Sequence, residues 1–175
     1  MAAIAPPVEA SRAPATLVPA PLASTELVDI AAGLVAEARR WPAGRRAAGR
    51  TWELMVVSGG FEAWMIAWPP GGAIVLHDHG NSAGAVVVAT GELTETAIAE
   101  LPGGGVDSHS TALPEGSSIS FGPGHIHDIV NLGTATAISV HVYAPRLSAM
   151  TFYEILGGGL FRRHTVEYEL GEAHR

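Results

Sequence analysis

The chain has 175 residues, a formal net charge of −7 and no cysteine. This length suits one domain with its own core, and the acidic balance argues against a nucleic-acid-binding protein. The lack of cysteine excludes a disulfide scaffold, a thiolate zinc site and a cysteine nucleophile. No apolar run reaches the roughly 18 residues of a membrane span, and the N-terminus lacks the basic start of a signal peptide. We therefore expect a cytoplasmic protein with no membrane segment.

The first part of the chain predicts a mobile segment followed by one helix. Residues 1–23 are rich in alanine and proline and have few large apolar side chains, so we expect them not to pack. Ser24 is a candidate N-cap, and Pro42 and Gly44 are typical of a helix end. Between them the apolar residues recur at helical spacing: Leu27, Ile30, Ala31, Leu34, Val35 and Ala38. This predicts a helix over 24–41 that covers a sheet.

From Thr51 onward, short runs of β-forming residues alternate with turn residues, and Gly59-Gly60 predicts a hairpin. The expected strands are 51–57, 61–68, 73–77, 84–90, 92–99, 108–112, 117–121, 128–131, 137–143, 150–155 and 161–169. Regular short strands without helices between them indicate an all-β sandwich or barrel. We expect a barrel over about residues 50–170, within one domain spanning 24–175.

Histidines form the strongest candidate site. His77 and His79 lie two residues apart on a predicted strand, so both side chains project to the same face. A third candidate is His127, and His125 competes with it because it would share the same face of an extended segment. Three imidazoles of this kind could hold one metal ion.

Glycine, proline and asparagine residues frame these histidines at fixed intervals. The frames are Gly71, His77-Asp78-His79 and Gly91, and then Gly116, Gly122-Pro123-Gly124, His127 and Asn131. Together they resemble the two motifs of the cupin superfamily, which implies a small double-stranded β-helix (jelly-roll) barrel. The resemblance selects His127 over His125 as the third ligand.

One departure from the cupin motif changes the expected metal site. The glutamate ligand of the superfamily would fall near Ala83 or Gly84, and neither can bind a metal. The resemblance then implies three neutral histidines with up to three coordination positions left open. That arrangement suits Fe(II) with an anionic ligand and oxygen, and Zn(II) on three histidines is the alternative.

Ser139-Val140-His141-Val142-Tyr143 is a second pattern of interest. Alternation along a strand puts Ser139, His141 and Tyr143 on one face. Such a row is either an exposed polar face or a buried hydrogen-bonded chain that ends at the metal pocket.

With His77-Asp78-His79-Gly80, His127, Asn131 and the segment 139–145, the chain resembles the thiol dioxygenases of the cysteine dioxygenase type. The resemblance implies Fe(II) as cofactor, a small thiol and O2 as substrates, and a sulfinate as product. It also implies that Ser139, His141 and Tyr143 form the catalytic hydrogen-bonded chain. Some relatives link a cysteine to this tyrosine, but that position is Gly84 here, so Tyr143 should be a free phenol.

The carboxylate end of the substrate needs a cation. Arginine binds carboxylates in a bidentate manner. The resemblance makes Arg50, at the start of the first strand, the main candidate and Arg146 the second, although both could be surface residues. We expect L-cysteine as substrate. The alternatives are another thiol acid, such as 3-mercaptopropionate or mercaptosuccinate, or a metal-dependent cupin isomerase or ligand-binding cupin. The oligomeric state stays open.

Overall fold

The computed structural model describes residues 22–41 and 49–168. The expected mobile segment 1–23 falls almost entirely outside this part of the chain. The described residues form one helix and eleven strands: α1 (Ser24–Arg39), β1 (Thr51–Val57), β2 (Glu62–Trp68), β3 (Ala73–His77), β4 (Ala83–Thr90), β5 (Glu92–Glu100), β6 (Val106–Pro114), β7 (Ser118–Phe121), β8 (Ile126–Val130), β9 (Ala137–Ala144), β10 (Ala149–Leu156) and β11 (Gly159–Glu167). The all-β prediction with an N-terminal helix is confirmed.

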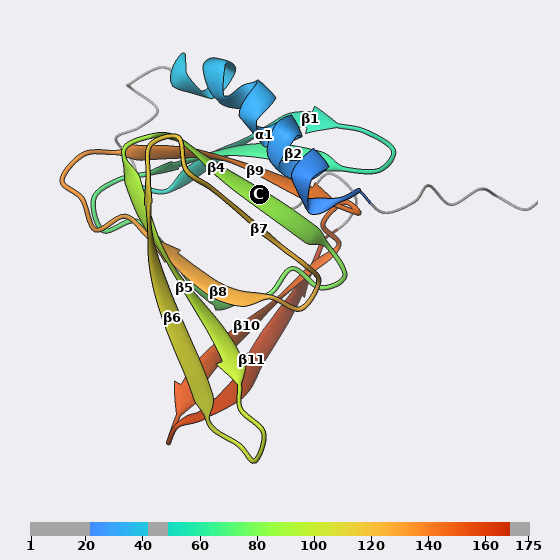
Figure 1. Ribbon diagram of the computed structural model, residues 1–175, viewed down its shortest axis with the longest axis vertical. Coiled ribbons are helices and arrows are strands. Elements are labelled where there is room, and N and C mark those ends of the chain that lie inside the picture. Colours follow the sequence, from blue (N-terminus) through green and yellow to red (C-terminus); the bar gives the residue numbers. More distant parts are fainter. Residues whose placement is uncertain (1–21, 42–48, 169–175) are drawn as a thin grey trace, which may run out of the picture.

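The strands form two antiparallel sheets. One has the order β1-β2-β9-β4-β7, and the other has the order β11-β10-β3-β8-β5-β6. Figure 1 shows the two sheets facing each other, with α1 lying across the outer side of the first sheet, over β4 and β9. The β5–β6 and β10–β11 hairpins extend away from α1 at the other end of the molecule.

The central strands β2, β9 and β4 are buried on both faces, which explains why their sequences are apolar almost throughout. Alternate residues pack on opposite sides. Ala63, Met65, Val140 and Val142 belong to the layer under α1. Trp64, Ile66, Trp68, Val86 and Tyr143 belong to the interior between the sheets. The face that carries Tyr143 is therefore the interior face.

The helix begins at Ser24 as predicted, but its N-cap residue and its C-terminal end differ from the prediction. Ala23, not Ser24, is the N-cap residue, and its N–H is satisfied by the Glu26 carboxylate at 2.7 Å. The helix ends at Arg39 instead of residue 41. Trp41 leaves the helix because its ring is buried, with its indole N–H donating to Glu53 at 3.1 Å.

Most expected strands agree with the observed ones within two residues. The difference that matters for the site is β8, which begins at Ile126 and not at residue 128. His127 thus lies inside a strand, while His125 precedes it at the end of the turn. No helix in the described ranges is long and apolar enough to cross a membrane.

Candidate active site

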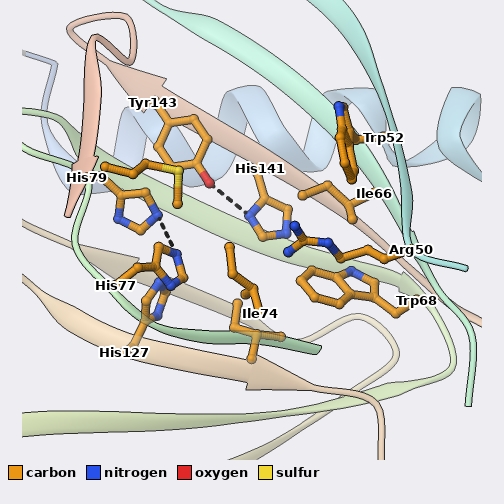
Figure 2. A pocket seen from close by; sticks show the side chains of 12 residues that line it. Arg50, Trp52, Ile66, Trp68, Ile74, His77, His79, His127, His141 and Tyr143 are labelled. Carbon is orange, nitrogen blue, oxygen red and sulfur yellow. Dashed lines mark hydrogen bonds between the residues drawn. The ribbon is translucent and has the colours of Figure 1, made fainter. Parts of the chain in front are cut away.

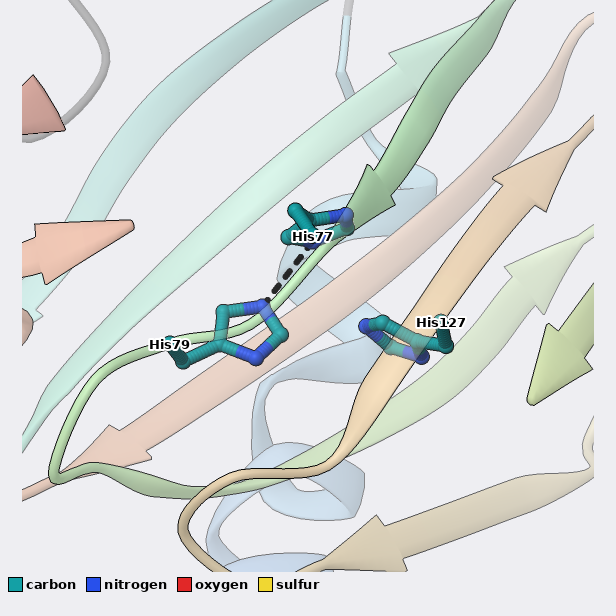
Figure 3. A group of neighbouring side chains, drawn as sticks. All are labelled: His77, His79 and His127. Carbon is teal, nitrogen blue, oxygen red and sulfur yellow. Dashed lines mark hydrogen bonds between the residues drawn. The ribbon is translucent and has the colours of Figure 1, made fainter. Parts of the chain in front are cut away.

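Three strand segments bring the histidines together. His77 ends β3 and is the cross-strand partner of His127 on β8, and His79 follows two residues after His77. Their ligand nitrogens all lie within 4.8 Å of one another, and all three residues are buried. Figure 3 shows the three imidazole rings converging on one point. The structure brings together the three histidines chosen from the sequence.

Asp78, between His77 and His79, faces away from the histidine cluster and shapes the turn. Its carboxylate accepts hydrogen bonds from the Gly80 N–H at 2.9 Å, the Thr151 N–H at 3.2 Å and the Tyr153 hydroxyl at 2.6 Å. These bonds tie the turn to β10. Asp78 therefore holds the backbone between His77 and His79.

Hydrogen bonds determine which nitrogen two of the histidines present. His77 Nδ1 lies 2.9 Å from the carbonyl of Val75, and His127 Nδ1 lies 2.7 Å from the Glu95 carboxylate. Both partners are acceptors, so each Nδ1 carries the proton and each neutral ring keeps its Nε2 lone pair. Nε2 of His77 and Nε2 of His79 are 3.1 Å apart. Two ligands about 2.1 Å from one ion would lie about 3 Å apart, so the donor set fits a metal.

Burial keeps the rings of His79 and His127 neutral. Burial first, and then the neighbouring imidazoles, hold the pKa of His79 well below its usual value. Burial also lowers the pKa of His127, although Glu95 opposes this effect. Neutral imidazole is the form that binds a metal, so these two histidines do not need to lose a proton near neutral pH.

Glu95 on β5 is a site residue that the sequence analysis missed. One of its oxygens accepts from both His125 Nε2 at 2.9 Å and His127 Nδ1 at 2.7 Å. Burial alone would raise the pKa of this carboxyl, but the two histidine hydrogen bonds outweigh it and lower the pKa to about 2. Glu95 therefore orients His127, and it engages His125 away from the cluster. No local pattern marks Glu95, because β5 pairs with β8 only in the folded sheet.

Ser139, His141 and Tyr143 form the chain of hydrogen bonds that the family resemblance implied, and all three are buried. Ser139 Oγ lies 2.8 Å from His141 Nε2, and His141 Nδ1 lies 3.2 Å from the Tyr143 hydroxyl oxygen. The row thus faces the interior, and the exposed alternative does not apply.

Trp68 on β2 extends this chain. Its indole N–H donates to Ser139 Oγ at 2.8 Å, and the Ser139 hydroxyl can in turn donate to His141 Nε2. In the His141 tautomer that this requires, Nδ1 carries the proton and donates to the Tyr143 oxygen, and the Tyr143 hydroxyl can donate into the pocket. Burial, and then the Glu62 carboxylate, raise the pKa of Tyr143, so the phenol stays protonated.

A pocket joins the histidines to Arg50. Its lining is Arg50, Trp52, Ile66, Trp68, Ile74, His77, His79, His127, Ile129, His141, Tyr143 and Met150. Figure 2 shows the three histidines at one end and Arg50 at the other, beside Trp68. The guanidinium carbon lies 5.2 Å from the Trp52 ring centre and 5.4 Å from that of Trp68. Burial lowers the pKa of Arg50, but a guanidinium keeps its charge.

Arg146 lies elsewhere. Its Nε is 3.5 Å from the carboxylate of Glu62, which is fully buried, and it does not contribute to the pocket lining. Of the two arginines chosen from the sequence, the structure brings Arg50 and not Arg146 to the pocket. The burial of Glu62, on β2, is a tertiary feature and could not be read from the residues around Arg146.

The fold and the site define a cupin barrel with a three-histidine centre that could bind a metal. The model of the cysteine dioxygenase type I family matches residues 22–155, which is most of the chain. This protein belongs to that family. Family membership implies a metal in the site and an enzyme that resembles cysteine dioxygenase.

Solved structures support the same fold. An oxalate oxidase in complex with glycolate aligns with a TM-score of 0.53 and 20% identity over 61% of this chain. The chain spans 56% of the length of that oxalate oxidase. Peruvianin-I, described as a cysteine peptidase from Thevetia peruviana latex, aligns with a TM-score of 0.51 and 20% identity, over 70% of this chain and 75% of that one. At this identity the likeness concerns the fold alone.

Proposed function

We propose that this protein is an iron(II) thiol dioxygenase that oxidises a small thiol acid, foremost L-cysteine, to its sulfinic acid. The overall change adds both atoms of O2 to the sulfur, so that RSH and O2 become RSO2H. The observation that carries the proposal is one pocket that holds the histidine cluster, the hydroxyl of Tyr143 and the guanidinium of Arg50. The family match supports it.

His77, His79 and His127 are the residues that would hold the metal, through three neutral Nε2 atoms. Bound Fe(II) would supply a redox-active Lewis acid with open positions for a thiolate and O2. The three neutral ligands leave the full positive charge of the ion in place, which favours an anionic substrate.

Arg50 binds and orients the other end of the substrate. Its planar guanidinium can pair with a carboxylate, and the flanking rings of Trp52 and Trp68 limit how the side chain can turn. With the carboxylate held at one end and the sulfur at the other, the reacting sulfur is confined beside the histidines.

Tyr143 and the pocket walls act on the reacting group itself. The Tyr143 hydroxyl can donate its proton in a hydrogen bond to oxygen as negative charge develops on the sulfinate. Ile66, Ile74, Ile129 and Met150 provide apolar walls that exclude water from the pocket.

Among the pocket-lining residues, Arg50 is the one side chain with a permanent positive charge. This favours a substrate with one carboxylate, such as cysteine or 3-mercaptopropionate, over the dicarboxylate mercaptosuccinate. Because the lining contains no aspartate or glutamate, the ammonium group of cysteine would have no carboxylate partner there. An assay with both compounds therefore decides whether cysteine or 3-mercaptopropionate is the better substrate.

The test is anaerobic loading of the purified protein with Fe(II), followed by measurement of oxygen uptake with a panel of thiols. We expect uptake and a stoichiometric sulfinate with cysteine. Equal rates with cysteine and 3-mercaptopropionate would identify the wider thiol acid class. No uptake with any thiol would exclude the dioxygenase and leave the isomerase or ligand-binding alternatives.

A further inference from the structure

The three histidines of the cluster are not held in the same way. His77 and His127 each have their second ring nitrogen fixed by an acceptor, Val75 in one case and Glu95 in the other. The second nitrogen of His79, Nδ1, is buried and has no hydrogen-bond partner among the described residues. When Nε2 binds a metal, a contact other than a hydrogen bond to Nδ1 must therefore set the orientation of the His79 ring.

Phe121, at the end of β7, supplies the closest parallel surface. Its ring and that of His79 are stacked, with centroids 5.0 Å apart and planes inclined by 19°. By contrast, the Tyr143 ring meets His79 at 4.9 Å with a tilt of 33°. A stacked neighbour restricts rotation of an imidazole about its last torsion angle, which is otherwise broad.

The same phenylalanine also contacts the His125–Glu95–His127 group. It stacks on His125 at 5.1 Å and 13°, and it meets the edge of His127 at 5.0 Å and 64°. His125 is in turn bound to Glu95 at 2.9 Å. Phe121 thus connects the one histidine without a hydrogen-bonded Nδ1 to the part of the site that hydrogen bonds hold in place.

The position of the Phe121 ring depends on a glycine. Gly84 on β4 is the cross-strand partner of Phe121. A Cβ atom at Gly84 would lie 2.5 Å from two carbons of the Phe121 ring and 3.2 Å from the Tyr143 ring. Any side chain at residue 84 would push the phenylalanine away from its present place.

We propose that Phe121 is the positioning residue for His79, which it holds by ring stacking in place of a hydrogen bond, and that Gly84 provides the space for its ring. This inference rests on the proposed metal centre. It extends the centre with two residues that do not touch the metal but determine the geometry of one ligand.

The experiment measures metal affinity, not turnover. The dissociation constant for Co(II) is measured by competition with a chromophoric chelator, for the wild-type protein, Phe121→Leu, Gly84→Ala and the double variant. Leucine keeps the apolar volume and removes the ring face. Loss of a residue that orients a ligand weakens metal binding by about 10- to 100-fold, so we expect this loss for Phe121→Leu, with a changed visible absorption spectrum of bound Co(II).

The double variant tests the role of Gly84. Gly84→Ala alone should also weaken Co(II) binding, because the new methyl group displaces the ring. In the Phe121→Leu background the same change should have little further effect, because no ring remains to be displaced. If the loss of Co(II) affinity in the double variant equals the product of the losses in the two single variants, Gly84 and Phe121 act independently and the link between them is wrong.

Two controls separate positioning from general destabilisation. Phe161→Leu removes a half-exposed phenylalanine on β11, and Gly122→Ala adds a methyl group where nothing lies within 4 Å. Both should bind Co(II) as the wild type does. If Phe121→Leu lowers the melting temperature of the metal-free protein but leaves the Co(II) affinity and spectrum unchanged, Phe121 only fills the core, and the inference is wrong. If the wild type binds no divalent metal, the proposed function fails instead.

Discussion

At the scale of single residues, the partners of the histidines decide which of them can bind a metal. His125 and His127 are two residues apart and hydrogen-bond to the same oxygen of Glu95. His127 uses Nδ1 for this bond and keeps Nε2 for the cluster. His125 uses Nε2, and it is partly exposed at the end of a turn. The chemical difference between them is therefore which nitrogen remains available.

We predict that His127→Ala abolishes retention of Fe(II), while His125→Ala keeps most of it. The first change removes one of three ligands, and the second removes one of two partners of Glu95. Metal content after desalting of anaerobically loaded protein measures both. Greater loss of iron in His125→Ala than in His127→Ala would mean that His125, and not His127, is the third ligand.

Replacement of Arg50 and of Arg146 by alanine should affect different properties, KM in the first case and stability in the second. We predict that Arg50→Ala raises KM for a thiol carboxylate about 10- to 100-fold, because a charge-assisted pair contributes about 1.5–3 kcal/mol. Arg146→Ala should leave KM unchanged and lower the free energy of unfolding by about 1–3 kcal/mol, because the buried Glu62 loses its cation. Steady-state oxygen uptake and urea unfolding measure the two effects. An unchanged KM in Arg50→Ala would contradict the carboxylate role.

At the scale of elements, β9 lies at the centre of its sheet, between β2 and β4. Its alternation sends Val140 and Val142 under α1 and the serine, histidine and tyrosine into the interior. Because this polar row is buried, its members must form hydrogen bonds with other protein groups. Trp68 on the neighbouring strand β2 supplies one of them, to Ser139. The chain from Trp68 to Tyr143 thus spans two paired strands.

We predict that Trp68→Phe lowers kcat about fivefold and leaves KM nearly unchanged. Phenylalanine keeps a ring beside Arg50 but removes the N–H that donates to Ser139, a loss of about 1 kcal/mol. Trp52→Phe is the matched control, because the Trp52 ring also lies against Arg50 but belongs to β1, which β2 separates from Ser139 and His141 on β9; it should retain kcat. Equal losses of kcat in both tryptophan variants would exclude a role for the Trp68 N–H.

We predict that Tyr143→Phe retains bound iron. Its rate of thiol oxidation should fall, or a smaller fraction of the oxygen consumed should appear as sulfinate.

At the scale of the whole molecule, the cluster joins distant parts of the chain within one sheet. His77 and His127 are partners across β3 and β8, and Phe152 on β10 pairs with His77 on the other side. A metal bound only by the folded arrangement must stabilise the fold, because the unfolded chain does not hold these side chains together.

We predict that Fe(II) at 100 times its dissociation constant adds about 2.7 kcal/mol to the free energy of unfolding. For a chain of this size the melting temperature should rise by about 5–10 °C. His77→Ala should show no such rise at the same Fe(II) concentration. Anaerobic differential scanning calorimetry makes the measurement, and an equal rise in His77→Ala would point to binding elsewhere.

Local periodicity determined much of this protein from the sequence alone. Alternation along a strand put Ser139, His141 and Tyr143 on a common face. The two-residue spacing of His77 and His79 also placed them together, although β3 ends at His77 and His79 lies in the segment that follows it. The helical stripe likewise identified the residues of α1 that pack on the sheet, such as Leu27 and Ala31. These features depend only on neighbours in the chain.

The tertiary structure decided the rest, because it depends on which strands pair and what they bury. Pairing of β5 with β8 brought Glu95 to His127, and pairing of β2 with β9 brought Trp68 to Ser139. The buried Glu62 pairs with Arg146, and Arg50 is the cation that lines the pocket. No spacing within one strand carries this information, since each contact joins residues that meet only when the sheets have formed.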